Sequence, residues 1–309
     1  MLSVIIPSYN EHENIKRTAS VIAGILRENG IPYELIFVDD GSRDDTWREI
    51  TAASEADPNV RGLGFSRNFG KEGAIFAGLK NAAGDCAVCI DCDLQHPPEL
   101  IPEMYRLWQG GAEVVEAVKR SRGREGLLHK LFARSFYKMM KSSSGISLDG
   151  ASDFKLMKVI NALNELPERI TFFRALSSWV GFTVERVEFD VQPRAAGKSK
   201  FSMKSLFKFA LNNITSFTNV PIHLITWVGV IFFVMALVLG VQTLVKYFCG
   251  QAAEGFSTVI LLILITGACI LLGVGVIGYY LSKIYEEIKQ RPRYIISRTA
   301  GGKGSDNGN

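Results

Sequence analysis

The segment DCDLQHPPE (Asp91–Glu99) and the residues just before it hold two sets of side chains that could bind a metal ion. The first set is soft, and consists of Cys86, Cys89, Cys92 and His96. Thiolates and imidazoles at such spacings could suit zinc. The second set is hard, and offers oxygen atoms from Asp91, Asp93 and Gln95. Oxygen ligands of this kind suit Mg²⁺ or Mn²⁺, so the local backbone decides which chemistry is possible.

The run DCAVCID that enters this segment is short, apolar and typical of a buried strand. Because side chains alternate along a strand, Cys86 and Cys92 are expected on one face and Cys89 on the other. Three thiols placed in this way cannot converge on one ion without a sharp distortion. Asp91 and Asp93 share a face, where two carboxylates would repel each other unless a cation joined them. We therefore favour Mg²⁺ or Mn²⁺ over zinc and interpret the cysteines as small apolar strand residues.

Strand patterns and helical patterns alternate over residues 1–200. The expected strands are Ser3–Asn10, Tyr33–Ser42, Asn59–Ser66 and Asp85–Asp91. The expected helices are Glu13–Glu28, one from about Asp45, Gly70–Ala83, and one opened by Pro97 and Pro98. This alternation predicts an α/β domain with a mainly parallel sheet.

Ligands of such sheets gather at the carboxyl ends of the strands. That edge collects Pro7–Glu11, Val38–Ser42 and Asp91–Gln95. No G-x-G-x-x-G follows the first strand, where a dinucleotide cofactor would require it. A Rossmann-type oxidoreductase is therefore disfavoured, while a phosphate-bearing ligand with a metal ion is favoured.

Two long apolar runs lie toward the C-terminus. Ile222–Val245 and Phe256–Leu281 contain no Asp, Glu, Lys or Arg, and each exceeds the ~20 residues that a helix needs to cross a bilayer. Basic residues flank the pair on its outer sides, so both termini are expected in the cytoplasm. These runs predict a multi-pass protein of the inner or plasma membrane, with a short external loop and five reduced cysteines.

The rest of the chain gives weaker signals. The net charge of +4 does not suggest a nucleic-acid partner. Amphipathic helices are predicted at about 125–141 and within 201–220, either packed on the domain or lying in the membrane interface. The resulting organisation is a catalytic domain at 1–200, a juxtamembrane helix at 201–220, two spans within 221–283 and a basic cytoplasmic tail at 284–309.

Five motifs together carry a resemblance to a known family. They are, in order, VIIPSYNE, VDDGSRDDT, FSRNFGKEGAI, DCDLQHPPE and RAAGKSKFS. The chain resembles the family-two glycosyltransferases of GT-A fold, and more narrowly the polyprenyl-phosphate glycosyltransferases such as dolichol-phosphate mannose synthase and the bactoprenol glucosyltransferases. The resemblance extends over about Leu2–Arg298 and includes both apolar runs and the RPRY segment.

The resemblance implies a role for each matching residue. The implied nucleotide-binding residues are Pro7, Tyr9, Glu11, Val38, Asp40, Asp91 and Cys92. Asp93 and Gln95 are implied to hold the Mg²⁺ or Mn²⁺ that bridges the diphosphate, which makes Asp93 catalytic as well. The implied phosphate contacts are Lys119, Arg194 and Lys200. Asp153, in SDFKLM, matches the position of a proposed catalytic base, although it could instead position a lysine or the acceptor. Ser152 and Lys119 depart from the Gly and Arg common at their positions.

The expected reaction follows from this resemblance. It is inverting transfer of a sugar, with UDP-glucose as the expected donor, to undecaprenyl phosphate at the cytoplasmic leaflet. A lipid monophosphate has its second pKa near ~6 and arrives largely anionic, so a strong base is not needed. Other donors (UDP-GlcNAc, GDP-mannose or a UDP-amino sugar), a processive polysaccharide synthase and a non-catalytic membrane adaptor are the alternatives. The partners implied are the nucleotide sugar, the polyprenyl phosphate, the lipid bilayer and further copies of the chain, since tetramers occur in the family.

Overall fold

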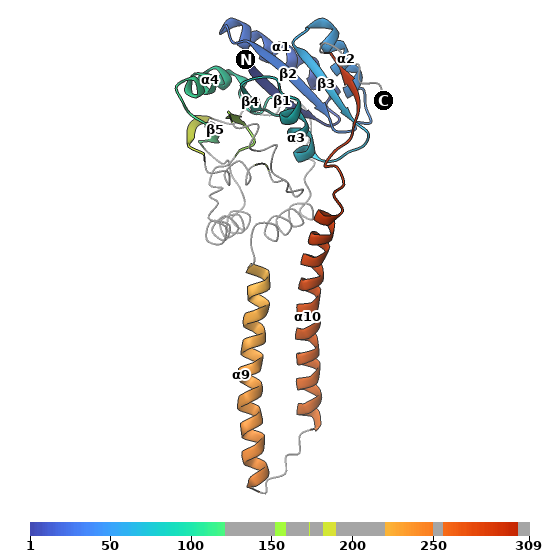
Figure 1. The fold of residues 1–309 in the computed structure, drawn as a ribbon, viewed down its shortest axis with the longest axis vertical. Helices are drawn as coiled ribbons and strands as arrows, with labels where there is room; N and C mark the ends of the chain where they lie inside the picture. The colour runs from blue at the N-terminus through green and yellow to red at the C-terminus, as the bar shows by residue number, and fades with distance from the viewer. Residues whose placement is uncertain (121–151, 159–172, 174–181, 190–219, 250–255, 302–309) are drawn as a thin grey trace. The chain divides into compact units, whose positions relative to one another are not determined.

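The computed structural model describes residues 1–120, 152–158, 173, 182–189, 220–249 and 256–301 (Figure 1). The chain divides into two units: Met1–Lys141, Ile146–Phe201 and Arg291–Asn309 in the first, Ser142–Gly145 and Ser202–Gln290 in the second. The amphipathic helix predicted at 125–141, residues 201–219 of the juxtamembrane helix, and both Arg194 and Lys200 lie outside the described residues.

The first unit is an α/β domain. Its strands are β1 (Leu2–Ser8), β2 (Tyr33–Asp39), β3 (Val60–Phe65), β4 (Cys86–Cys89), β5 (Val114–Lys119), β6 (Lys155–Met157), β7 (Val184–Phe189) and β8 (Ile296–Ala300). Its helices are α1 (His12–Glu28), α2 (Thr46–Ala56), α3 (Lys71–Asn81) and α4 (Ile101–Gln109), with a 3₁₀ turn, η1 (Pro98–Leu100), before α4. All of the strands and helices expected up to α4 are confirmed.

The described strands form one sheet in the order β7-β5-β6-β4-β1-β2-β3-β8. Strand β1 pairs in parallel with β2 and β4, and β2 pairs in parallel with β3. The antiparallel members are β6, between β4 and β5, and β8 at the far edge. The prediction of a mainly parallel sheet is therefore confirmed. It brings the carboxyl ends of β1, β2 and β4 to the same edge.

The central strands are mostly apolar because both faces of the sheet are covered. One core cluster contains Leu2, Val4 and Ile6 of β1 together with apolar residues of α1 and α4. A second cluster joins Ile36 and Val38 of β2 to alanines of α3. Burial on two sides removes the need for polar residues at every second position. A continuous apolar run consequently marks these strands.

The segment DCDLQHPPE differs from the expected strand. Strand β4 ends at Cys89, and Leu94 has a positive φ of 52° within the turn that follows. The prediction that strand alternation governs Asp91–Gln95 is therefore wrong, because these residues lie beyond the strand. Alternation still holds further back. Cys86 and Val88 of β4 belong to the larger core cluster, which does not include Cys89.

Burial makes the three thiols poor metal ligands. It raises the pKa of Cys86 and of Cys92 to about 12, and the pKa of Cys89 well above its ordinary value. A metal requires the thiolate, which these surroundings disfavour. The cysteines serve as small core side chains.

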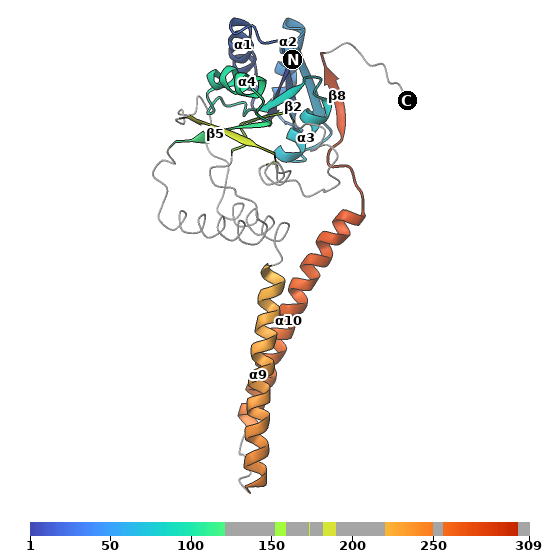
Figure 2. The ribbon, with the colours of Figure 1, turned by 60° about the vertical axis from the view of Figure 1, so that its left-hand side comes forward.

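Strand β8 was not expected from the sequence. Residues 296–300 fall in the region that was predicted to be a basic tail, yet they pair antiparallel with β3 (Figure 2). Arg298 lies opposite Gly64, and Ala300 lies opposite Gly62. The segment after the last long helix is therefore part of the sheet.

The second unit contains the helices α9 (Val220–Phe248) and α10 (Phe256–Ile288). Many apolar side chains on both are exposed, among them Trp227 on α9 and Leu271 on α10. Within the part of the chain that the structure describes, Ile265–Tyr285 is the one segment long and apolar enough to cross a membrane. The apolar segment of α9, Ile225–Leu239, is shorter. The two spans predicted from the sequence stay a prediction.

Candidate active site

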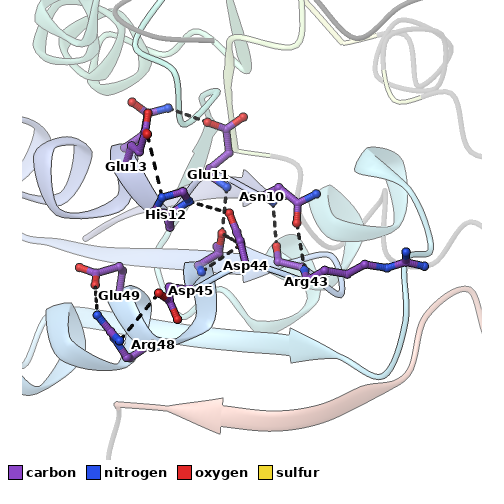
Figure 3. Close-up of polar contacts among 12 residues, drawn as sticks. Asn10, Glu11, His12, Glu13, Arg43, Asp44, Asp45, Arg48 and Glu49 are labelled. Atoms are coloured by element: carbon purple, nitrogen blue, oxygen red, sulfur yellow. Dashed lines mark hydrogen bonds and ion pairs between the residues drawn. The ribbon is translucent and has the colours of Figure 1, made fainter. Parts of the chain in front are cut away.

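The loops after β1 and β2 are joined by hydrogen bonds at the edge of the sheet (Figure 3). The backbone N–H of Asn10 donates to Ser42 Oγ at 2.9 Å, and the backbone N–H of Arg43 donates to Asn10 Oδ1 at 2.9 Å. The backbone N–H of Glu11 donates to Thr46 Oγ1 at 2.8 Å. Asn10 has a positive φ of 53°, a conformation that asparagine tolerates better than most residues. These bonds fix the backbone on which the predicted nucleotide-binding residues Tyr9 and Glu11 lie.

A second pair strengthens this junction of the two loops. His12 Nδ1 lies 2.8 Å from Asp44 Oδ2, and Thr46 Oγ1 donates to Asp44 Oδ1 at 2.5 Å. The hydrogen bond with Asp44 raises the pKa of His12 despite the opposing effect of desolvation. Protonation of His12 therefore adds to the stability of this junction.

Asp40 connects the turn after β2 to the start of α3. Its carboxylate accepts hydrogen bonds from the backbone N–H of Phe69 at 2.6 Å and of Gly70 at 2.9 Å. Burial raises the pKa of Asp40, while these two hydrogen bonds oppose the rise. Gly41 has a φ of 66°, and a Cβ there would collide with the backbone of Arg67. Its carboxylate therefore holds the start of α3, and the nucleotide-binding role predicted for Asp40 stays a prediction.

Lys71, the first residue of α3, lies between two carboxylates. Its Nζ is 2.5 Å from Asp91 Oδ1 and 2.9 Å from Asp153 Oδ2. Burial disfavours the charge of this ammonium, but Asp91 and Asp153 outweigh that effect and raise the pKa of Lys71. Burial likewise opposes ionisation of Asp91, and Lys71 with His96 lowers its pKa nevertheless. The three residues form a charged cluster that unites α3, the turn after β4 and the loop before β6.

Lys71 was not among the predicted site residues. The sequence signal was the motif FSRNFGKEGAI, in which a glycine precedes the lysine at the start of an expected helix. In the structure this glycine, Gly70, has a φ of 94°. The sequence alone did not reveal the partners of this lysine, because Asp91 and Asp153 come from distant segments.

The loop that carries Asp153 rests on a buried ion pair. Lys155 Nζ lies 3.0 Å from Glu116 Oε1, and both side chains are almost fully buried. The same carboxylate oxygen accepts a hydrogen bond from the backbone N–H of Ser152 at 3.2 Å. Ser152 Oγ in turn accepts one from the N–H of Phe154 at 3.1 Å. These contacts fix the backbone on both sides of Asp153, and they give the serine that replaces the usual glycine a structural role.

Asp93 and Gln95 lie in the turn after β4. Asp93 Oδ1 accepts a hydrogen bond from the backbone N–H of Gln95 at 3.1 Å, and both residues are partly exposed. Among the described residues, no group of three or more His, Cys, Asp or Glu side chains forms a complete metal site. An accessible turn with a carboxylate and an amide oxygen fits Mg²⁺, which takes one or two protein ligands and fills its other positions with water and substrate phosphates.

Two predicted nucleotide-binding side chains are buried in the core. Val38 is 0% exposed and packs among the residues of β2, β3 and α3. Cys92 is 3% exposed, and its backbone oxygen accepts a hydrogen bond from Thr18 Oγ1 at 2.8 Å. Neither side chain lies at the open edge, and the nucleotide-binding role of these two residues stays a prediction. Pro7 is partly buried near the end of β1. Lys119 is the last residue of β5, and its side chain lies outside the part of the chain that the structure describes.

Residues 3–160 match the sequence model of glycosyl transferase family 2. The chain belongs to this family. This family-2 glycosyltransferase is 36% identical over 305 residues to the SfII prophage-derived bactoprenol glucosyl transferase of Shigella flexneri, with 97% of this chain and 99% of the relative covered. It is 38% identical over 307 residues to the glycosyltransferase YkcC of Bacillus subtilis, with 97% and 94% covered.

A solved structure gives a further likeness. Glucosyl-3-phosphoglycerate synthase from Mycobacterium tuberculosis, in complex with Mn²⁺, UDP-glucose and phosphoglyceric acid, matches with a TM-score of 0.53 at 21% identity. The match covers 70% of this chain and 77% of the synthase. Together with the family match, it confirms the GT-A fold that the motifs predicted.

Proposed function

We propose that this family-2 glycosyltransferase moves glucose from UDP-glucose to a polyprenyl phosphate, with inversion at the anomeric carbon. The observation that carries the proposal is similarity over nearly the whole chain to a relative whose name states bactoprenol glucosyl transfer. The solved structure of a related fold, which holds UDP-glucose and Mn²⁺, supports a nucleotide-sugar donor with a divalent ion.

The donor would bind at the carboxyl ends of β1, β2 and β4. Tyr9 and Glu11 stand on the loop that the β2 turn holds in place, and Tyr9 is 36% exposed. Asp93 and Gln95 would hold Mg²⁺ or Mn²⁺, whose chemistry there is to neutralise the charge of the departing diphosphate. Asp91 and its ion-pair partner Lys71 would also contact the donor.

The acceptor would be oriented by the Lys71 cluster. An oxygen of the lipid phosphate attacks the anomeric carbon as the bond to UDP breaks, and UDP leaves with the electron pair. The phosphate is already anionic, so this step needs alignment and charge stabilisation more than proton removal. Asp153 forms an ion pair with Lys71 at 2.9 Å and would anchor the ammonium. An ammonium has three N–H donors, so Lys71 can hold Asp91, Asp153 and one phosphate oxygen together.

The helices α9 and α10 would anchor the enzyme in the membrane. We propose that both cross the bilayer, with the catalytic unit on the cytoplasmic side where basic flanking residues are retained. The exposed apolar side chains on both helices support this proposal. Cysteine scanning of residues 250–255 with a membrane-impermeant reagent on intact cells tests it. Labelling only after lysis would contradict the two-span arrangement.

Transfer can be tested with purified protein in lipid nanodiscs. The protein is incubated with undecaprenyl phosphate and, separately, UDP-glucose, UDP-GlcNAc and GDP-mannose, and the lipid product is analysed by mass spectrometry. We expect a monoglucosylated lipid from UDP-glucose. A different sugar on the lipid would redirect the donor assignment, a polymer would indicate a processive synthase, and no lipid product from any donor would overturn the proposed function.

The metal role has a matched control. We expect Asp93→Asn to abolish transfer while the protein remains folded. Asp85, at the opposite end of β4, binds the N-terminal amine. Asp85→Asn should therefore leave transfer unchanged. Wild-type transfer by the Asp93 variant would refute a metal role for this residue.

A further inference from the structure

The segment that follows α10 docks on the sheet through more than strand pairing. Tyr294 stacks on Phe65 of β3, with ring centroids 5.2 Å apart and an interplanar angle of 9°. The guanidinium of Arg293 lies 5.1 Å from the ring centroid of Phe76 on α3. The backbone N–H of Ser66 donates to the carbonyl of Ile295 at 3.0 Å. These contacts hold residues 293–300 in one defined position against β3 and α3.

Arg298 reaches from β8 to a buried carboxylate at the end of β2. Its Nη2 donates to Asp39 Oδ2 at 2.9 Å, and Asp39 is 0% exposed. The same guanidinium lies 4.5 Å from the ring centroid of Trp47. A Cβ on Gly64 would approach Arg298 Cγ to 2.6 Å, so the glycine in β3 makes room for this side chain. The position is built for a planar cation, since arginine can pair with a carboxylate and stack on an aromatic ring at once.

Asp39 connects Arg298 to the two loops, after β1 and β2, that would hold the donor. Its second oxygen, Oδ1, accepts a hydrogen bond from the backbone N–H of Ser42 at 2.9 Å. Ser42 Oγ then accepts the backbone N–H of Asn10, which belongs to the loop after β1. A single chain of contacts therefore runs from Arg298 through Asp39 and Ser42 to Asn10. It links strand β8 to both loops that would hold the nucleotide.

We propose that Arg298 is a positioning residue for the nucleotide site. It neutralises Asp39 and so keeps that carboxylate oriented toward Ser42, which holds the two loops in their binding conformation. Without this cation a fully buried carboxylate carries an uncompensated charge, which favours its turning toward water and away from Ser42. The identity of the ligand rests on the proposed function, whereas the ordering of the loops does not.

Hydrogen exchange of the full-length protein in nanodiscs measures loop order directly. In Arg298→Met we expect the backbone amides of peptides covering 9–12 and 40–46 to exchange about tenfold faster than in wild type. The dissociation constant for UDP, measured by calorimetry, should rise about tenfold, with kcat for transfer affected less than the donor KM. Arg298→Lys should fall between the two, because lysine keeps the charge without the planar stacking.

Arg61→Met is the matched control. Arg61 pairs with the buried Glu34 at 2.8 Å, at the start of the parallel strands rather than at their carboxyl ends. The Arg61→Met substitution removes an arginine that pairs with a buried acid in the same sheet. It should leave hydrogen exchange of the two loops unchanged. Wild-type exchange of these loops in Arg298→Met, or equal loop exchange in both variants, would overturn the inference.

A second variant covers the case in which Arg298→Met folds poorly. Asp39→Asn keeps an oxygen that can accept the Ser42 N–H but removes the charge that Arg298 neutralises. The double variant Arg298→Met/Asp39→Asn should therefore recover slow exchange and most of the UDP affinity. A double variant no better than the single one would also overturn the inference. If wild-type protein does not bind UDP, the proposed function fails, and loop exchange still decides the role of Arg298.

Discussion

Replacing Lys71 with methionine tests the centre of the proposed active site. Methionine approximates the length of the lysine side chain but removes the ammonium that lies 2.5 Å from Asp91 and 2.9 Å from Asp153. The carboxylates of Asp91 and Asp153 would then repel each other without a cation between them. We expect Asp153 to lose its fixed orientation and the donor phosphates to meet more negative charge, so transfer should slow.

The size of this effect can be estimated from the charges. Two unit charges about 4 Å apart attract by about 4 kcal/mol at the effective dielectric constant near a protein surface. The Lys71 side chain is 41% exposed, so water replaces much of that attraction, and we reduce the loss to about 1–3 kcal/mol. Each 1.36 kcal/mol of lost transition-state stabilisation slows a reaction about tenfold. The expected loss in kcat/KM is therefore about 5- to 150-fold.

The assay is steady-state transfer to undecaprenyl phosphate with varied UDP-glucose, at matched protein folding judged by thermal unfolding. Lys80→Met is the control, because Lys80 lies exposed near the other end of α3. Lys71→Arg should retain part of the activity, since it keeps the charge with a different geometry. A Lys71→Met enzyme within twofold of wild type, and equally stable, would refute the reasoning that this ammonium organises the site.

Three further predictions concern the support of the site. Gly41→Ala should lower the free energy of unfolding by about 1–3 kcal/mol, seen as a lower Tm, because its positive φ and the nearby backbone exclude a Cβ; an unchanged Tm would contradict this. The raised pKa of His12 means that its bond to Asp44 stabilises the fold fully below about pH 6.5 and less as pH rises through the folded-state pKa. The Tm difference between wild type and Asp44→Asn should therefore narrow from pH 5.5 to pH 8 (roughly the range in which histidine titrates), and a constant difference would argue against it. Lys155→Met should cost about 3–5 kcal/mol by leaving Glu116 buried without its cation, and adding Glu116→Gln should recover most of the loss in denaturant unfolding.

The sequence revealed the edge of the sheet that carries the site, but not the contacts within it. Apolar runs followed by polar loops were enough to bring Pro7–Glu11, Val38–Ser42 and Asp91–Gln95 together, because parallel strands align their carboxyl ends. Alternation failed at Asp91 because it applies only while the chain is extended, and β4 ends two residues earlier. The apolar pattern of the sequence therefore does not predict the direction of individual side chains in these loops.

Long-range partners were the other limit. Asp40 has the residue type of a ligand contact, yet tertiary packing directs its carboxylate to the backbone of Phe69 and Gly70. The roles of Lys71 and β8 depend on segments that are far apart in the sequence, and nothing local to either one specifies its partner. The short stretch at Ile296–Ala300 also has too few residues to be distinguished from a basic tail by periodicity.

The pairing of β8 with β3 sets the order in which the protein can be completed during synthesis. Strand β3 is made early, whereas Arg298 follows Asp39 by 259 positions. At about 5–20 residues per second, the ribosome leaves that edge of the sheet open for roughly 10–50 s. An open edge presents unpaired N–H and C=O groups to other strands. The edge of β3 is therefore covered only after α10 has been translated, and a chain whose synthesis stalls before β8 would still display an edge that chaperones and proteases can recognise.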